Sequence, residues 1–278
     1  MQEQSLERWR VFLNKVMTRL RDVLAEAEAG CRDVVTSHAT DPLPLGNVLG
    51  ALGTRKQGLE GKISDAWREQ ASKHLAEAPP GGGAVDPRAL AQGEREMHEV
   101  LAWMEDTWEH FRVRWSAEAM RAMWPHVRAS MQKPVTCHQC SAPIEPPVRH
   151  EASSVSCASC GRANEVAPEP LVYTYFAMAP HAIAEEQVLE QRLMITRFRR
   201  DVAAWRNAET SRNGSPPEEG IESLRRWEAM ERSYWSAYAA AKARLDPATP
   251  EEQQRVVDAR MKQFTDQQLS AHAAWRSR

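Results

Sequence analysis

Two Cys-x-x-Cys pairs constrain the fold of this 278-residue chain more than any other feature of its sequence. Cys137 and Cys140 form the first pair, and Cys157 and Cys160 form the second after an interval of 16 residues. Four thiolates satisfy the tetrahedral preference of Zn²⁺, and pairs at this spacing can present all four to one ion. The pattern therefore predicts one structural zinc ion per chain, bound by these four cysteines.

The residues beside the cysteines are typical of zinc knuckles. Gly161 follows the second pair, where a knuckle favours a residue with positive φ, and Ser141 stands at the equivalent position of the first pair. We expect short strands at 134–136, 154–156 and 165–167. Two knuckles between short strands resemble the zinc-ribbon family of modules, and the resemblance covers about residues 134–167. Zinc ribbons serve nucleic-acid binding, protein binding and purely structural roles, so the resemblance leaves the ligand open.

Other chemistry fits the cysteines less well. A redox dithiol needs one reactive Cys-x-x-Cys at the start of a helix. An iron–sulfur centre also uses four cysteines, but it is less usual at this spacing. Four sulfurs suffice for zinc, so we expect His138 and His150 at the surface. Cys31, outside the module, is expected to be a small buried apolar residue.

Long helices are expected before the module, because apolar residues recur there at steps of three and four. The first helix should end or bend at Gly30 or in the run 38–42, and the second should run from about 45 to 78. A linker at 79–87 then precedes a third helix, capped by Asp86, which Pro125 should break or kink. The apolar positions of the first and third helices are Leu6, Trp9, Leu13, Val16, Leu20, Val23, Ala27, Met97, Leu101, Met104, Trp108, Phe111 and Trp115.

Beyond the module, the alternation at 171–176 predicts a strand that ties the ribbon to the helices. Helix should resume at about 181 and end in a linker at 213–217. Two further helices are expected on either side of Asp246-Pro247, with capping-box starts at Ser215 and Thr249 and with Trp275 inside the last one. The sequence thus predicts a mainly α fold, a long-helix antiparallel bundle or coiled coil with an inserted small β zinc ribbon.

These elements divide the chain into three expected regions. Residues 1–132 form an N-terminal helical region with three long helices. Residues 133–178 form the zinc ribbon with its adjoining strand. Residues 179–278 form a C-terminal helical region with three helices, which is expected to pack with the first region.

Composition limits the classes of function. Lys and Arg total 36 against 38 Asp and Glu, whereas a dedicated nucleic-acid binder usually shows a basic excess. Ten Trp residues exceed the five Phe and four Tyr, and they are expected to anchor helix packing or an interface. The start of the chain lacks a signal-peptide apolar region, and no stretch is apolar enough to span a membrane. With cysteines spaced for a metal, we expect a cytoplasmic protein.

No motif of a catalytic site is present, and no small-molecule substrate is evident. We therefore expect a non-enzymatic protein–protein interaction, scaffold or adaptor protein, whose partner is another protein or a second copy held through the helix seams. The alternative is a nucleic-acid-associated protein that uses the ribbon and a basic helix face, although acidic residues precede that face on the same helix. The basic face comprises Arg192, Arg197, Arg199, Arg200, Arg225, Arg226 and Arg232.

Overall fold

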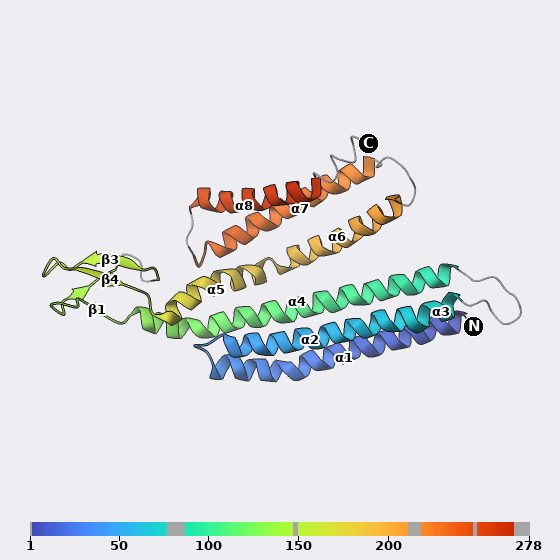
Figure 1. The fold of residues 1–278 in the computed structure, drawn as a ribbon, viewed down its shortest axis with the longest axis horizontal. Helices are drawn as coiled ribbons and strands as arrows, with labels where there is room; N and C mark the ends of the chain where they lie inside the picture. Colours follow the sequence, from blue (N-terminus) through green and yellow to red (C-terminus); the bar gives the residue numbers. More distant parts are fainter. Residues whose placement is uncertain (1, 77–86, 147–149, 211–217, 247–248, 270–278) are drawn as a thin grey trace, which may run out of the picture. The chain divides into compact units, whose positions relative to one another are not determined.

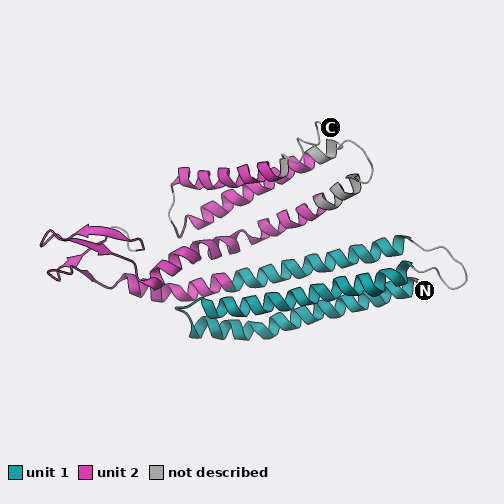
Figure 2. Cartoon of the chain, in the orientation of Figure 1, with its two compact units in different colours: residues 1–115 teal, residues 116–278 magenta. Residues whose placement is uncertain are grey.

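The computed structural model describes residues 2–76, 87–146, 150–210, 218–246 and 249–269. The fold is mainly helical with two small antiparallel sheets, as the sequence predicts. The chain separates into two compact units, residues 1–115 and 116–278 (Figure 2). The boundary lies within the long helix α4 (Pro87–Met131), so each unit contains part of that helix.

In the first unit, α1 (Gln2–Ser37), α2 (Leu43–Ala66) and the first part of α4 lie side by side (Figure 1). A π-helical turn, η1 (Trp67–Ala71), and the short α3 (Ser72–Ala76) continue α2. The indole N–H of Trp9 donates to the carbonyl of Gly93 at 3.0 Å, and Glu28 pairs with Arg114 further along both helices. Residue numbers increase together in these contacts, so α1 and α4 run parallel.

The second helix runs antiparallel to α4. Lys56 pairs with Glu105, whereas the later residue Trp67 lies against the earlier residue Gly93. A Cβ atom at Gly93 would lie 2.8 Å from the Trp67 ring, closer than packed atoms allow, so glycine is needed there. Gly53, on α2, faces the ring of Trp108. These two glycines, one on each helix, let tryptophan rings approach a helix backbone.

The apolar seams predicted for the first and third helices lie largely in the core. Ala27, Leu101 and Phe111 are only half-buried. The buried members are Leu6, Trp9, Leu13, Val16, Leu20, Val23, Met97, Met104, Trp108 and Trp115.

In the second unit, the end of α4 leads through the ribbon to α5 (Pro170–Gln187), α6 (Leu189–Thr210), α7 (Glu218–Lys242), α8 (Pro250–Phe264) and the π-turn η2 (Thr265–Leu269). The last four α-helices bury one apolar cluster. Its largest members include Trp227, Tyr234, Tyr238 and Phe264.

The ribbon consists of two hairpins. One pairs β1 (Val135–Thr136) with β2 (Pro143–Ile144), and the other pairs β3 (Ser153–Ser156) with β4 (Ala163–Val166). The strands predicted at 134–136 and 154–156 overlap β1 and β3. The strand predicted at 165–167 starts two residues later than β4, and β2 was not predicted.

The strand predicted at 171–176 is wrong, because these residues form the first turns of α5. Pro170 occupies the first helical turn, where its missing N–H has no cost. Val172, Tyr175 and Ala179 are buried at steps of three and four. Tyr173 is exposed, whereas Tyr175 is buried. The alternation that predicted a strand therefore comes from bulky side chains on two faces of a helix. Helix therefore begins at Pro170 instead of about 181, and α6 begins after Val188.

Other predicted helix ends have mixed outcomes. The first helix continues past Gly30 and ends at Ser37, and the helix expected to break or kink at Pro125 is not broken there but runs on to Met131. Pro125 removes one N–H on an exposed face, while Met123 and Val127 are buried on either side of it. Apolar packing thus continues through the proline.

The capping box at Thr249 is confirmed. Its Oγ1 accepts the N–H of Glu252 at 3.2 Å, and the Glu252 carboxylate accepts the N–H of Thr249 at 2.8 Å. The expectations for Asp86, Ser215, Trp275 and the linkers at 79–86 and 213–217 fall outside the described residues.

Candidate metal centre

Each cysteine pair lies in a turn of the same hydrogen-bonding pattern. The N–H of Cys137 donates to the carbonyl of Ala142 at 2.9 Å, and the N–H of Ser141 donates back to the carbonyl of Cys137 at 2.9 Å. The second turn repeats this arrangement, with the N–H of Cys157 donating to the carbonyl of Arg162 and the N–H of Gly161 donating to that of Cys157, each at 2.8 Å.

These turns require positive φ at the residue that follows each pair. Gly161 has φ 71° and Ser141 has φ 58°, as the sequence predicts for two knuckles. Glycine adopts this region at no steric cost, whereas serine carries a Cβ that the region disfavours. The first knuckle is therefore the more strained of the two.

The two turns and the four strands that flank them bring the predicted cysteine sulfurs together. All four Sγ atoms lie within 4.8 Å of one another, with Cys137 and Cys160 3.7 Å apart and Cys140 and Cys157 3.6 Å apart. Sulfurs placed tetrahedrally around zinc at about 2.3 Å are separated by about 3.8 Å. Disulfide sulfurs lie only about 2.05 Å apart. The cluster therefore has the dimensions of a metal site with four thiolates.

Backbone donors stabilise negative charge on one sulfur of each pair. The N–H groups of Cys140 and Gln139 point at the Cys137 sulfur and lower its pKa to about 6. In the same way, the N–H groups of Cys160 and Ser159 lower the pKa of Cys157.

The pKa of Cys140 moves in the opposite direction. The N–H of Ala142 lowers it, but the facing Cys160 and Cys157 sulfurs outweigh that effect and raise it to about 12. Sulfurs this close cannot all be negative without a cation among them. The donor set therefore suits a divalent, thiophilic metal ion.

The Asn164 side chain joins the two knuckles by hydrogen bonds. Its side chain is only 2% exposed, and its Oδ1 accepts the backbone N–H of His138 at 3.1 Å, while its Nδ2 donates to the carbonyl of Arg162 at 2.8 Å. One side chain thus holds a backbone group in the first knuckle and another in the second.

Sequence reasoning missed Asn164, although a signal was present. Asn164 follows Cys160 by four residues, and the buried Ile144 follows Cys140 by four. A polar residue at the buried position of one repeat needs hydrogen-bond partners inside the module.

Glu169, which precedes α5, joins the two points at which the chain enters and leaves the ribbon. The Glu169 carboxylate accepts the hydroxyl of Ser130 at 2.5 Å and pairs with Lys133 at 2.9 Å. The hydrogen bond from the Ser130 hydroxyl lowers the pKa of Glu169 most, and Lys133 lowers it further. Glu169 thus holds the start of α5 against the end of α4.

The two histidines of the module and the fifth cysteine, Cys31, lie outside the four-cysteine cluster. His138 is exposed, as expected, but the His150 side chain is 25% exposed and its ring stacks on Phe176 at 4.2 Å. The expectation of a surface His150 is therefore corrected, because the α5 aromatic residue covers one ring face. Cys31 is fully buried in the first unit, as predicted, and burial raises its pKa.

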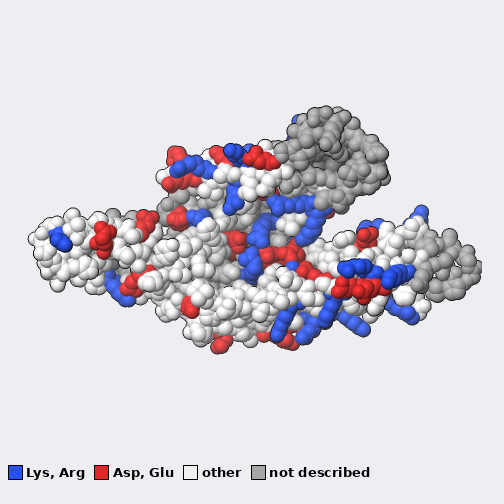
Figure 3. Space-filling view, viewed as in Figure 1, with Lys and Arg blue, Asp and Glu red and all other residues white. Residues whose placement is uncertain are grey.

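The basic face on α6 and α7 is extensively neutralised. Arg199 pairs with the buried Glu231 at 2.5 Å, and Arg192 pairs with Glu185 at 3.5 Å. In Figure 3, basic and acidic side chains are intermixed along the helices, and the ribbon shows few charges. In addition, Arg225 pairs with Glu222, Arg232 pairs with Glu228, and Arg226 lies over the Phe198 ring.

Comparison with known proteins finds no match to this chain among family models, curated proteins or solved structures. In the part of the chain that the structure describes, no helix has both the length and the apolar character needed to cross a membrane.

Proposed function

We propose that this chain is a non-enzymatic protein-interaction protein, a scaffold or adaptor, whose ribbon is built around one structural Zn²⁺. The zinc ligands are Cys137, Cys140, Cys157 and Cys160. The observation that supports the metal is the separation of 3.6 and 3.7 Å between facing sulfurs, close to the tetrahedral value. Cysteines kept for metal binding also suit a reducing, cytoplasmic compartment.

A structural role for the metal follows from its ligand set. Four protein sulfurs close the tetrahedron, whereas a catalytic zinc keeps one position open for water or substrate. The β1–β2 and β3–β4 hairpins contain only a few paired residues each. A module with so small a core depends on metal binding for much of its folding free energy.

Protein binding is supported by two exposed apolar side chains on α5. Tyr173 is 65% exposed and Met178 is 44% exposed, and both lie on the helix whose Phe176 ring stacks on His150 of the ribbon. Aromatic residues and methionine are enriched at protein interfaces, where charged residues are depleted. Ribbon and helix together present a fixed, weakly charged surface to a partner protein.

The metal is tested by elemental analysis of protein purified without added metal. We expect one zinc per chain, loss of zinc in Cys137→Ser and Cys160→Ser, and retention in Cys31→Ser. Iron, or a ratio near zero in the parent protein, would contradict the proposal.

The interaction is tested by affinity capture with the parent chain and with a Tyr173→Ser, Met178→Ser variant. The parent should retain a partner that the variant loses, and the purified pair should bind directly with the same difference. The variant should unfold at the parent temperature, because both side chains are exposed. A partner that binds both proteins equally would place the interface elsewhere.

The alternative, a nucleic-acid-associated protein, has less support because several arginines of α6 and α7 pair with acidic side chains. Titration of labelled DNA and RNA at low and physiological salt distinguishes the two. Phosphate contacts release counterions, so genuine binding would weaken steeply as salt rises. The interaction proposal predicts no such binding by the parent chain.

A further inference from the structure

A cleft of about 430 Å³ lies in the ribbon, at the place where the chain enters and leaves it. One wall comes from residues within 133–138, which include β1, and the other from residues within 164–169, which include most of β4. No backbone hydrogen bond between described residues joins these two walls. In this ribbon cleft, β1 and β4 therefore face each other without being paired into one sheet.

Each end of the ribbon cleft is bridged through a side chain. Lys133 pairs with Glu169 at 2.9 Å, and at the other end the N–H of His138 donates to the side chain of Asn164 at 3.1 Å. The two walls therefore run antiparallel, and their backbones lie further apart than the roughly 4.8 Å between paired strands. One extended chain between them needs about 9.6 Å, twice that spacing. At about 3.3 Å per residue each wall is about 17 Å long, which is room for about five extended residues.

The register of the first hairpin shows which backbone groups of β1 face the ribbon cleft. Thr136 lies opposite Pro143, and proline has no N–H to donate. The next residue, Cys137, donates its N–H to the carbonyl of Ala142. Hydrogen-bonded and non-hydrogen-bonded positions alternate along an antiparallel pair. The N–H and the carbonyl of Thr136 therefore point away from β2, toward the cleft that Thr136 lines.

The second hairpin places matching groups on the opposite wall. The N–H of Cys157 donates to the carbonyl of Arg162, and from there the two kinds of position alternate along β3 and β4. Glu165 lies opposite Ser154 at a non-hydrogen-bonded position, so its N–H and carbonyl point away from β3. The backbone groups of Thr136 and Glu165 have no hydrogen-bond partner among the described residues. Two open strand edges thus line one cleft.

The charges at the ribbon cleft favour an occupant with a basic group. Lys133 and Glu169 pair with each other, whereas the exposed carboxylate of Glu165 has no partner among the described residues. Successive side chains of a strand point to opposite faces, so Asn164 is on the buried face of β4 and Glu165 is on the exposed face. A chain that enters from the exposed face meets one uncompensated negative charge.

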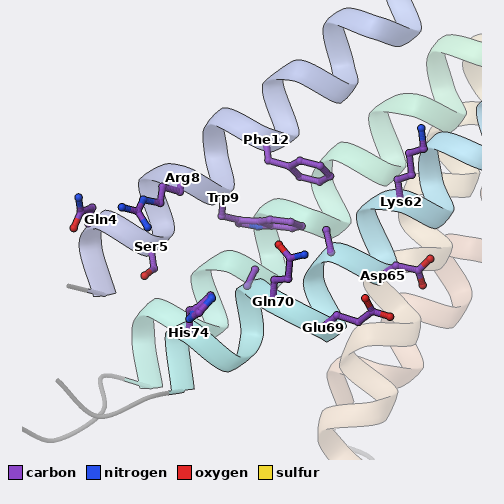
Figure 4. A pocket seen from close by; sticks show the side chains of 12 residues that line it. Gln4, Ser5, Arg8, Trp9, Phe12, Lys62, Asp65, Glu69, Gln70 and His74 are labelled. Carbon is purple, nitrogen blue, oxygen red and sulfur yellow. The ribbon is translucent and has the colours of Figure 1, made fainter. Parts of the chain in front are cut away.

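The larger cleft of the first unit offers no comparable groups. It lies between the start of α1 and the end of α2 with η1 and α3, and Trp9 and Phe12 extend toward it (Figure 4). Trp9 is only 4% exposed, and its ring already stacks on Phe12. Two basic side chains of the lining are offset by two carboxylates. Backbone groups inside helices bond to one another, so no open edge faces that cleft.

We propose that an extended segment of a partner protein, with one basic residue, binds in the ribbon cleft as an added β-strand. Thr136 on one side and Glu165 on the other supply its backbone donors and acceptors, and the added strand joins the two hairpins into one sheet. Backbone hydrogen bonds give strand addition its affinity, and the Glu165 carboxylate selects the basic residue. This binding mode rests on the proposed interaction function, because the zinc ion holds the two hairpin edges in place.

The test uses peptides selected from a displayed library of random heptapeptides on the zinc-loaded full chain. Each peptide is synthesised with blocked ends and a fluorescent label, and fluorescence anisotropy measures its binding. Glu165→Pro removes one outward N–H but no hydrogen bond between β3 and β4, and we expect it to weaken binding by about tenfold or more. Ser154→Pro is the matched control, because it removes the outward N–H of the facing residue on the edge away from the cleft. We expect it to bind like the parent.

The basic residue is tested with Glu165→Gln, which keeps the N–H and removes the charge. This variant should weaken binding several-fold, and the difference from the parent should vanish when the basic residue of the peptide is replaced by glutamine. Zinc content and circular dichroism of every variant show whether its ribbon and helices are kept. An undiminished effect on the glutamine peptide would overturn the role of the carboxylate.

Amide hydrogen exchange of the zinc-loaded parent chain tests the added strand without any substitution. The amides of Thr136 and Glu165 should exchange fast in the free chain and slowly in the peptide complex, whereas the Val166 amide should be protected in both. Recovery of no peptide, equal binding by Glu165→Pro and Ser154→Pro, or fast exchange of both amides in the complex would overturn the added strand. Peptides lost only in the Tyr173→Ser, Met178→Ser variant would support the proposed function and overturn this site. A parent chain without zinc would overturn the ribbon of the proposed function itself.

Discussion

The side-chain oxygen of Asn164 accepts the backbone N–H of His138 at 3.1 Å, and this bond joins the second knuckle to the first. The same side chain donates to the Arg162 carbonyl at 2.8 Å. Asn164 therefore fixes the relative position of the two cysteine pairs. Its recorded hydrogen bonds are to backbone groups and not to the sulfurs.

We predict that Asn164→Ala weakens zinc affinity by about 10–100-fold, the usual effect of losing a residue that orients metal ligands. Competition with a chromophoric chelator measures this affinity. Asn164→Asp keeps the acceptor for His138 but loses the donor to Arg162, so it should lie between the parent and the alanine variant. Ser154→Ala, an exposed position on β3, is the control and should bind zinc like the parent.

The two knuckle turns provide a second prediction. Ser141→Gly should raise the free energy of unfolding of the metal-bound ribbon by about 0.5–1 kcal/mol, because glycine removes the steric cost of positive φ. Gly161→Ala should lower it by about 1–2 kcal/mol for the converse reason. Denaturant unfolding of the two variants measures both effects. Changes of the same sign in the two variants would show that φ does not control these positions.

The pKa of Glu169 provides a pH prediction. Its folded-state pKa is lowered by Ser130 and then by Lys133, so it contributes stability above its unfolded pKa of about 4.3. That contribution disappears as the pH falls through the lowered folded-state pKa. We therefore expect Glu169→Gln to destabilise the second unit at neutral pH and to differ less from the parent in acid.

Thermal unfolding of both proteins across this pH range measures the difference between them. Metal release in acid affects the parent and the variant alike, so the comparison isolates Glu169. A difference that grows as the pH falls would contradict the assignment.

The packing of Trp108 provides the fourth prediction. Its ring lies against Gly53 and is only 8% exposed, so Trp108→Ala should cost about 3–5 kcal/mol and lower the unfolding temperature sharply. Trp124, later on α4 and 40% exposed, is the matched control, and Trp124→Ala should cost much less. If the two variants unfold alike, Trp108 is a docking residue instead of a core anchor.

The sequence determined the features that depend on neighbouring residues. The spacing of the four cysteines, the helical seam through Leu13 and Leu20, and the capping box at Thr249 all follow from local geometry. Within each cysteine pair, along the seam and in the capping box, the relevant atoms lie within about two turns of chain, so the residue pattern contains the required information.

Only the tertiary structure decided the features that depend on distant contacts. Residues 171–176 have an ambiguous pattern, and burial of Val172, Tyr175 and Ala179 against the rest of the second unit selects a helix over a strand. The roles of Gly93 and Asn164 depend on Trp67 and His138, each 26 residues away in sequence. The ribbon cleft likewise needs β1 and β4 side by side. Apolar burial and hydrogen bonding between distant segments outweigh local preference at these sites, and local patterns do not specify which segments will meet.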